Sequence, residues 1–174
     1  SQASSASWEE AEGDEEMACV SGIAPGVTGT TGLETAEIIK KTAEIAKPDV
    51  IVAVDSLAAR DIKRVSTTIQ INDTVIYPGG GMGNTRTELS RETVGAKVVS
   101  IGVPTVIDSK TLILEAMGDE QAEEYFRNRD MDMIVTSTDI DQIIKDFSDI
   151  IANGINIALH PGIYSYENIL EEKQ

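Results

Sequence analysis

Residues 51–62, IVAVDSLAARDI, decide the fold expected of this chain. An apolar, β-branched run ends in a carboxylate, Asp55, and passes at once into residues that favour a helix. Pro48 ends the preceding element, because the residue before a proline is pushed out of the helical region. Residues 50–54 are therefore expected to form a strand buried on both faces, as in a parallel sheet covered by helices. A carboxylate at the carboxyl end of such a strand lies where open α/β sheets bind their ligands.

The composition indicates one acidic domain. A chain of 174 residues is long enough for a single domain with a sizeable core. Its 30 acidic and 14 basic residues give a net charge of -16, which argues against nucleic acid or an anionic membrane as partner. The single cysteine, Cys19, excludes an internal disulfide and fits a reducing compartment. No apolar run reaches the roughly 18 residues of a membrane span, and the N-terminus lacks a secretory signal, so a cytoplasmic protein is expected.

Strands and helices alternate along most of the chain. Residues 1–18 are acidic and poor in apolar side chains, so we expect a flexible segment there, followed by a single α/β domain over residues 19–174. Extended segments are predicted at 20–24, 50–54, about 65–71, 98–103 and 133–135. Helices are predicted behind a capping box of Thr31 and Glu34, at about 56–63, at 109–117, and from a cap within 137–139 to Asn153. This alternation predicts an α/β fold with a mostly parallel twisted sheet.

Two details of this pattern concern where elements end and what they bury. Pro104 is expected to end the strand at 98–103, and Gly154 to end the last helix. The first helix should bury a stripe of small and apolar residues, namely Ala36, Ile39, Ala43 and Ala46. The last helix should turn its large apolar residues inward, namely Ile140, Ile143, Ile144, Phe147, Ile150 and Ile151.

Asp55 has two interpretations at this stage. It could cap the helix expected at 56–63, because an aspartate at a strand-to-helix junction accepts hydrogen bonds from free amides of the first turn. It could instead be a catalytic or metal-binding carboxylate, and one residue can serve both purposes. A general acid or base of this kind normally needs a second carboxylate, so that the two groups divide the protonation states between them.

The other candidate motifs do not match known catalytic or cofactor-binding patterns. The glycine run at 79–84 lacks the Gly-Lys-Ser/Thr of a phosphate loop and does not follow the first strand. A flexible loop that admits an extended peptide close to its backbone is the better interpretation, and a plain surface loop is the alternative. His160 has no neighbouring cluster of ligands, so we expect neither a metal nor another cofactor. No serine lies in a nucleophile elbow, and Cys19 has no local signature of a nucleophile.

Seven stretches taken together resemble the germination protease family of spore-forming bacteria, peptidase family A25. They are SGIAPGVTGTTGLETAEIIK, KPDVIVAVDSLAAR, TTIQINDT, PGGGMGNTRTELSRETVG, VVSIGVPTVID, MIVTSTDID and ANGINIALHPGI. The likeness runs in order from about residue 19 to about residue 163 and is specific as a set.

The resemblance implies an endopeptidase that degrades small acid-soluble spore proteins in the spore core during germination. It also implies an inactive precursor, a tetramer, and a three-layer α/β sandwich similar to hydrogenase-maturation peptidases. Family members are thought to use two catalytic aspartates, and Asp55 matches the second of them. Asp73, Gly81, Asn84 and Arg86 would then line a substrate-binding loop, where Arg86 could pair with an acidic group of the substrate.

The chain departs from the family pattern in two places. The family's other aspartate lies in an upstream segment that residues 1–18 do not match, so the chain is expected to be the C-terminal part of a larger peptidase domain. Tyr77 stands where the family usually has histidine. The alternative function is therefore a non-catalytic fragment or relative that keeps the fold for binding or assembly. A small-ligand protein is supported only by analogy of fold.

Overall fold

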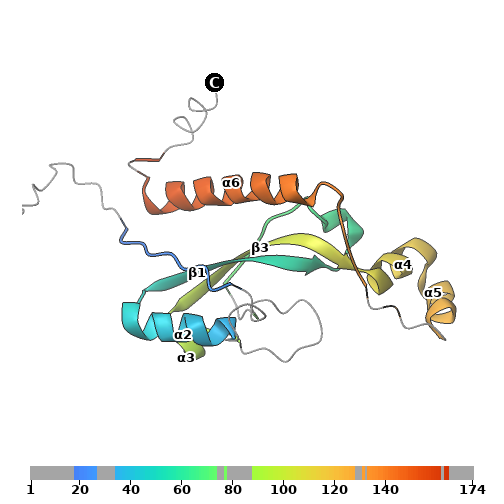
Figure 1. Cartoon of the computed structure of the whole chain (residues 1–174), viewed down its shortest axis with the longest axis horizontal. Helices are drawn as coiled ribbons and strands as arrows, with labels where there is room; N and C mark the ends of the chain where they lie inside the picture. The colour runs from blue at the N-terminus through green and yellow to red at the C-terminus, as the bar shows by residue number, and fades with distance from the viewer. Residues whose placement is uncertain are drawn as a thin grey trace, which may run out of the picture. The chain divides into compact units, whose positions relative to one another are not determined.

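The computed structural model describes residues 18–26, 34–73, 77, 88–127, 131, 133–161 and 163–164. Its elements in chain order are α2 (Thr35–Ala46), β1 (Val50–Ala59), the 3₁₀ helix η1 (Ile62–Arg64), β2 (Gln70–Asn72), α3 (Arg91–Val94), β3 (Lys97–Asp108), α4 (Ser109–Met117), α5 (Asp119–Phe126), β4 (Ile134–Thr136) and α6 (Ile140–Leu159) (Figure 1). The chain divides into two units, Ile23–Phe147 on the one hand and Ser1–Gly22 with Ser148–Gln174 on the other. The first unit holds the four described strands.

A mixed sheet forms around β3, so the α/β class is confirmed. The strand order is β1-β3-β2, and β4 also pairs with β3. β1 runs parallel to β3 (Figure 1), whereas β2 and β4 run antiparallel to it. The prediction of a mostly parallel sheet is therefore wrong for the described strands.

The connections between strands explain the antiparallel pairs. A parallel pair needs a crossover of about a dozen residues or more, usually with a helix, and the short segment between β1 and β2 contains only η1. After β3 the chain forms two consecutive helices, α4 and α5, and returns to the end of β3 that it left. The Ser109 N–H donates to the Met133 carbonyl at 2.9 Å, which brings β4 antiparallel to the last residues of β3.

β1 extends further than its sequence suggests. The strand continues through Ser56 to Ala59, and residues 62–64 form a 3₁₀ helix, so the prediction of a helix over 56–63 is wrong. Ala58 and Ala59 remain in register with Val106 and Ile107 of β3. Pairing with a long neighbouring strand thus overrides the helix preference of these residues. Asp55 consequently lies within a strand and caps no helix.

β3 runs through Pro104, which was expected to end it. Leu57 lies opposite Pro104 and Ala58 lies opposite Val106, so Thr105 is an extra residue on β3 and forms a β-bulge. Proline has no N–H to donate to a ladder, and a bulge is one of the few places in a sheet that tolerate this loss. The Pro104 carbonyl accepts a hydrogen bond from the Ser66 N–H at 2.6 Å.

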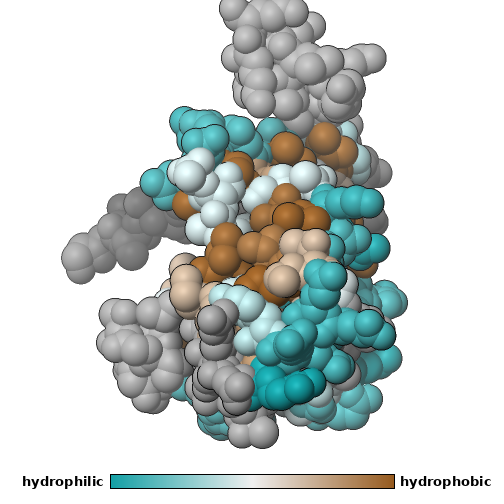
Figure 2. Space-filling model, turned by 90° about the vertical axis from the view of Figure 1, so that its right-hand side faces the viewer, coloured by the Kyte–Doolittle hydropathy of each residue, from teal (hydrophilic) through white to brown (hydrophobic). Residues whose placement is uncertain are grey.

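β3 contributes more buried apolar residues to the core than β1 does. Buried apolar residues of β3 are Val98, Val103 and Ile107. On β1, however, Val52 is 41% exposed and Val54 55% exposed, so the prediction that 50–54 is buried on both faces is wrong. Val54 and Ile71 both lie opposite Ile101, and Ile71 is 71% exposed. One face of the sheet therefore presents apolar side chains, and Figure 2 shows hydrophobic residues reaching the surface among hydrophilic ones.

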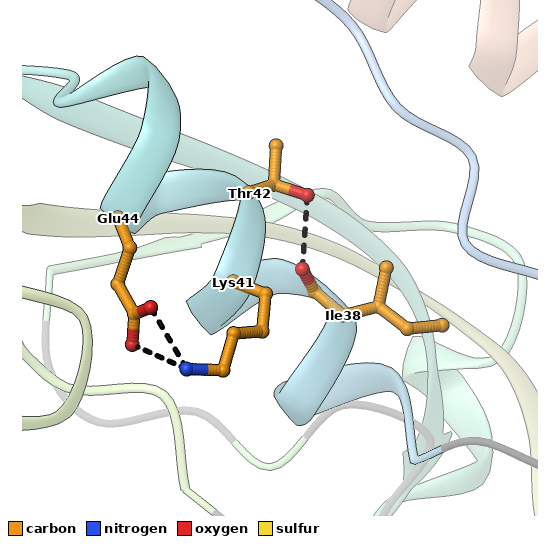
Figure 3. A network of polar contacts seen from close by, with 4 residues as sticks. All are labelled: Ile38, Lys41, Thr42 and Glu44. Atoms are coloured by element: carbon orange, nitrogen blue, oxygen red, sulfur yellow. Dashed lines mark hydrogen bonds and ion pairs between the residues drawn. The ribbon is translucent and has the colours of Figure 1, made fainter.

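α2 and α4 agree with their sequence patterns, apart from the start of α2 and the exposure of Ala46. Ala36 and Ala43 of the predicted stripe are buried, whereas Ala46 is exposed. α2 begins at Thr35, and Glu34 occupies the N-cap position without a side-chain cap bond, while Thr31 lies outside the described residues. On its exposed side Lys41 Nζ lies 2.8 Å from Glu44 Oε2, and this hydrogen bond lowers the pKa of Glu44 (Figure 3). α4 spans 109–117 as predicted.

α6 and the N-terminal segment differ from expectation. The helix continues past Gly154 to Leu159, because a glycine in a helix interior costs only about 1 kcal/mol relative to alanine. Among the six residues expected to point inward, Ile151 is buried but Ile144 and Ile150 are exposed. Residues 20–24 are described but form no strand. No helix in the described ranges is both long and apolar enough to span a bilayer.

Removing the cap of α4 tests this local structure. The Asp108 carboxylate accepts hydrogen bonds from the Lys110 N–H at 2.7 Å and the Thr111 N–H at 3.2 Å. Asp108→Ala should lower the free energy of unfolding by about 1 kcal/mol, measured by urea denaturation. Asp108→Asn keeps an acceptor and should retain most of that stability. Equal stability of wild type and Asp108→Ala would contradict the assigned cap.

Candidate functional site

Asp55 belongs to a row of three residues that crosses the sheet. It lies opposite Gly102 of β3, which in turn lies opposite Gln70 of β2. Directly opposite residues of neighbouring strands project to the same face, so these three residues, the Asp55 row, share one face of the sheet. The next row along consists of Ala53, Ser100 and Asn72.

The Asp55 carboxylate is exposed on this face. Its Oδ1 accepts a hydrogen bond from the Ser56 N–H at 2.8 Å. Asp55 was expected at the carboxyl end of its strand, but four further residues of β1 follow it. An exposed carboxylate that is oriented by a backbone amide can exchange a proton with a group that approaches from solvent. It can accept the proton when ionised and donate it when protonated.

Gly102, the neighbour of Asp55 on β3, is covered by the side chain of Leu57. A Cβ atom at Gly102 would lie 2.6 Å from Leu57 Cγ and 3.2 Å from Leu57 Cδ2. The Leu57 side chain therefore occupies the space above this glycine, two residues along β1 from Asp55. Neither residue was singled out from sequence, although a glycine within the apolar run VVSIGV is a known signal of close approach.

Three hydroxyl-bearing residues connect the strands just beyond Asp55. Ser56 Oγ and Thr105 Oγ1 form a hydrogen bond between β1 and β3. Thr136 Oγ1 of β4 donates to the Thr105 carbonyl at 2.7 Å. We call Ser56, Thr105 and Thr136 the hydroxyl chain. The hydroxyl chain connects β1, at the residue next to Asp55, to β3 and through β3 to β4.

The predicted substrate-loop residues are only partly described. Asp73 is exposed, and its Oδ2 lies 4.0 Å from Lys97 Nζ. It follows β2, three residues beyond Gln70 and two strands away from Asp55, so ordinary strand spacing separates the two aspartate Cα atoms by about 14 Å. The described structure therefore does not bring Asp73 to Asp55. Gly81, Asn84 and Arg86 lie outside the described residues.

Two further residues from the sequence analysis are placed elsewhere. Tyr77, at the family's histidine position, is exposed, and its hydroxyl donates to Glu88 Oε2 at 3.4 Å. His160 follows α6, and its ring centroid lies 6.4 Å from that of Tyr164. Within the described ranges, no group of three or more His, Cys, Asp or Glu side chains is arranged to hold a metal ion.

Comparison with known proteins places this sheet in a family. The model of the family described as germination protease matches residues 8–119, which include β1, β2, β3, α4 and the whole Asp55 row. The chain belongs to the germination protease family. The match begins before residue 19, where the motifs begin, and it ends before the C-terminal motifs.

Several proteins named germination protease are similar to this chain over most of its length. That of Clostridium perfringens is 40% identical over 178 residues, covering 86% of this chain and 55% of the relative. That of Clostridium acetobutylicum is 41% identical and covers 86% of this chain and 54% of the relative. That of Bacillus subtilis is 35% identical and covers 86% of this chain and 56% of the relative. The chain thus spans about half the length of these germination proteases.

The contact between Gly102 and Leu57 gives a prediction for this germination protease homologue. Gly102→Ala should lower the free energy of unfolding by about 1–3 kcal/mol, because the added methyl group overlaps Leu57. Adding Leu57→Ala should remove much of this penalty, so the two effects should be strongly non-additive in urea denaturation. Gly154→Ala is the matched control, since a Cβ there meets nothing within 4 Å and should stabilise α6. A Gly102→Ala protein as stable as wild type would refute the contact.

Proposed function

We propose that this chain is part of an endopeptidase in which Asp55 is one of two acid/base carboxylates. The observation that carries the proposal is the position of Asp55 within the family match, exposed on a sheet face and beside a glycine. Because the Asp55 carboxylate is exposed, it can be reached by an extended peptide that approaches this face from solvent.

Two carboxylates near one peptide bond can divide the proton transfers of hydrolysis. One, ionised, takes a proton from water while the water oxygen forms a bond to the carbonyl carbon. The other, protonated, donates its proton to the nitrogen as the carbon–nitrogen bond breaks. Mutual repulsion of two close carboxylates keeps one of them protonated, which suits this division. The second aspartate would come from the upstream segment that the resemblance implies.

We further propose the family's biological setting for the complete protein. Its substrates would be small acid-soluble spore proteins, cleaved in the spore core at germination by a tetramer that is made as an inactive precursor. The exposed apolar residues Val52, Val54 and Ile71 support an assembly larger than this chain, because large exposed apolar patches commonly mark contacts with other protein. Asp73, Gly81, Asn84 and Arg86 remain the proposed substrate-binding loop.

A second candidate function is binding or assembly without catalysis. One observation favours it: the other two residues of the Asp55 row, Gly102 and Gln70, carry no carboxylate. A family member of this kind would keep the sheet and the exposed apolar face while it lacked hydrolysis.

Cleavage of a spore protein distinguishes the two candidates. We expect the longest natural form of the protein to cleave a purified small acid-soluble spore protein, and Asp55→Asn to lower the initial rate at least about 100-fold, because a general acid or base contributes that much. Asp146→Asn is the matched control, since Asp146 lies on α6 and accepts from Gln142. Undiminished cleavage by Asp55→Asn would remove Asp55 from the mechanism. A folded wild type that binds but never cleaves the substrate would favour the second candidate.

A further inference from the structure

We propose that Thr105 is a positioning residue for Asp55 and acts through Ser56. The proposal rests on the proposed function of Asp55, which it deepens. The Ser56 N–H donates a hydrogen bond to the Asp55 carboxylate and so orients it. The Ser56 hydroxyl is hydrogen-bonded to the Thr105 hydroxyl. Ser56 thus links the carboxylate on one strand to the bulge residue of the next.

The need for such a link comes from Pro104. In the described sheet β1 pairs with β3 alone, so β1 depends on that one ladder. Opposite Leu57, two residues after Asp55, the ladder meets Pro104, which has no N–H to donate. The hydrogen bond between Ser56 and Thr105 joins the two strands at the place where the backbone ladder is weakened.

Thr105 is itself held firmly. It is 6% exposed, and its carbonyl accepts the bond from Thr136 of β4. Its β-branched side chain has little freedom at χ1, so the position of the Oγ1 atom follows the backbone of the bulge. The fixed partner in the link is therefore Thr105, and the exposed Ser56 is the residue that it holds.

The link also protects the register of β1. A slip of one residue would move Asp55 to the opposite face of the sheet. A neighbouring residue of β1 would then lie opposite Gly102 in its place. The bulge residue Thr105 meets Ser56 in the observed register, so this hydrogen bond favours the pairing that keeps Asp55 in its row. Bulges beside active sites commonly direct a side chain in this way.

A double-mutant cycle tests the proposal. The variants are Thr105→Val, Ser56→Ala and their combination, with Thr105→Ser as the rescue that keeps the hydroxyl. One readout is the hydrogen-exchange rate of the residue 56 amide by NMR, and the other is kcat and KM for spore-protein cleavage. Thr42→Val is the matched control, because the Thr42 hydroxyl bonds only to the Ile38 carbonyl in α2 among the contacts described for it (Figure 3).

We expect each single variant to speed exchange at residue 56 and to lower kcat about 5-fold with KM unchanged, as the loss of one hydrogen bond would. The double variant should be no worse than either single one, and Thr105→Ser should restore both readouts. Thr42→Val should change neither.

Several results would overturn the proposal. Unchanged exchange at residue 56 in Ser56→Ala or Thr105→Val would do so, as would effects that multiply in the double variant, or a loss of kcat that Thr105→Ser does not restore. If Thr105→Val does not fold, Ser56→Ala decides the question, because Ser56 is exposed. If Asp55→Asn cleaves normally, the proposed function fails, whereas the exchange readout still decides whether Thr105 holds the backbone at Asp55.

Discussion

The parallel pairing of β1 with β3 is the constraint on which the rest of this structure depends. β3 is the longest of the described strands, with 12 residues, and it pairs with each of the other three, β1, β2 and β4. The register of this pair places Asp55 beside Gly102, and Gly102 beside Gln70 of β2. It also holds Ala58 and Ala59 in a strand against their local preference for a helix. A substitution that weakens the pairing of β1 with β3 should therefore affect both the fold and the candidate site.

The candidate site lies where this pairing is least regular. Pro104 removes a backbone donor from β3, Thr105 bulges out, and Ser56 and Thr136 bond to it from the strands on either side. The sheet thus keeps its cohesion beside Asp55 through side-chain hydroxyl groups in place of a backbone amide. On the face that carries Asp55, the Leu57 side chain covers the cross-strand neighbour Gly102, while the Asp55 carboxylate itself is exposed.

Several apolar residues of the sheet are exposed in this member of the germination protease family. Sheets of α/β proteins usually have both faces covered, yet Val52, Val54 and Ile71 remain exposed. The chain spans about half the length of its relatives. The exposed apolar residues agree with the proposal that other protein covers this face in the proposed peptidase.

The sequence by itself determined the α/β class, the strand beginning at Val50, the helix at 109–117 and, through its motifs, the family. These features depend on local patterns, namely β-branched runs, and on exact wording over many short stretches. Only the tertiary structure decided that β1 reaches Ala59, that β2 and β4 are antiparallel, and that Pro104 lies inside a strand. It also revealed Gly102 under Leu57 and the bond from Ser56 to Thr105, whose partners are 49 residues apart in the sequence. Local preference carries no information about which distant strand will be the neighbour, and that neighbour decides strand length, direction and the surroundings of Asp55.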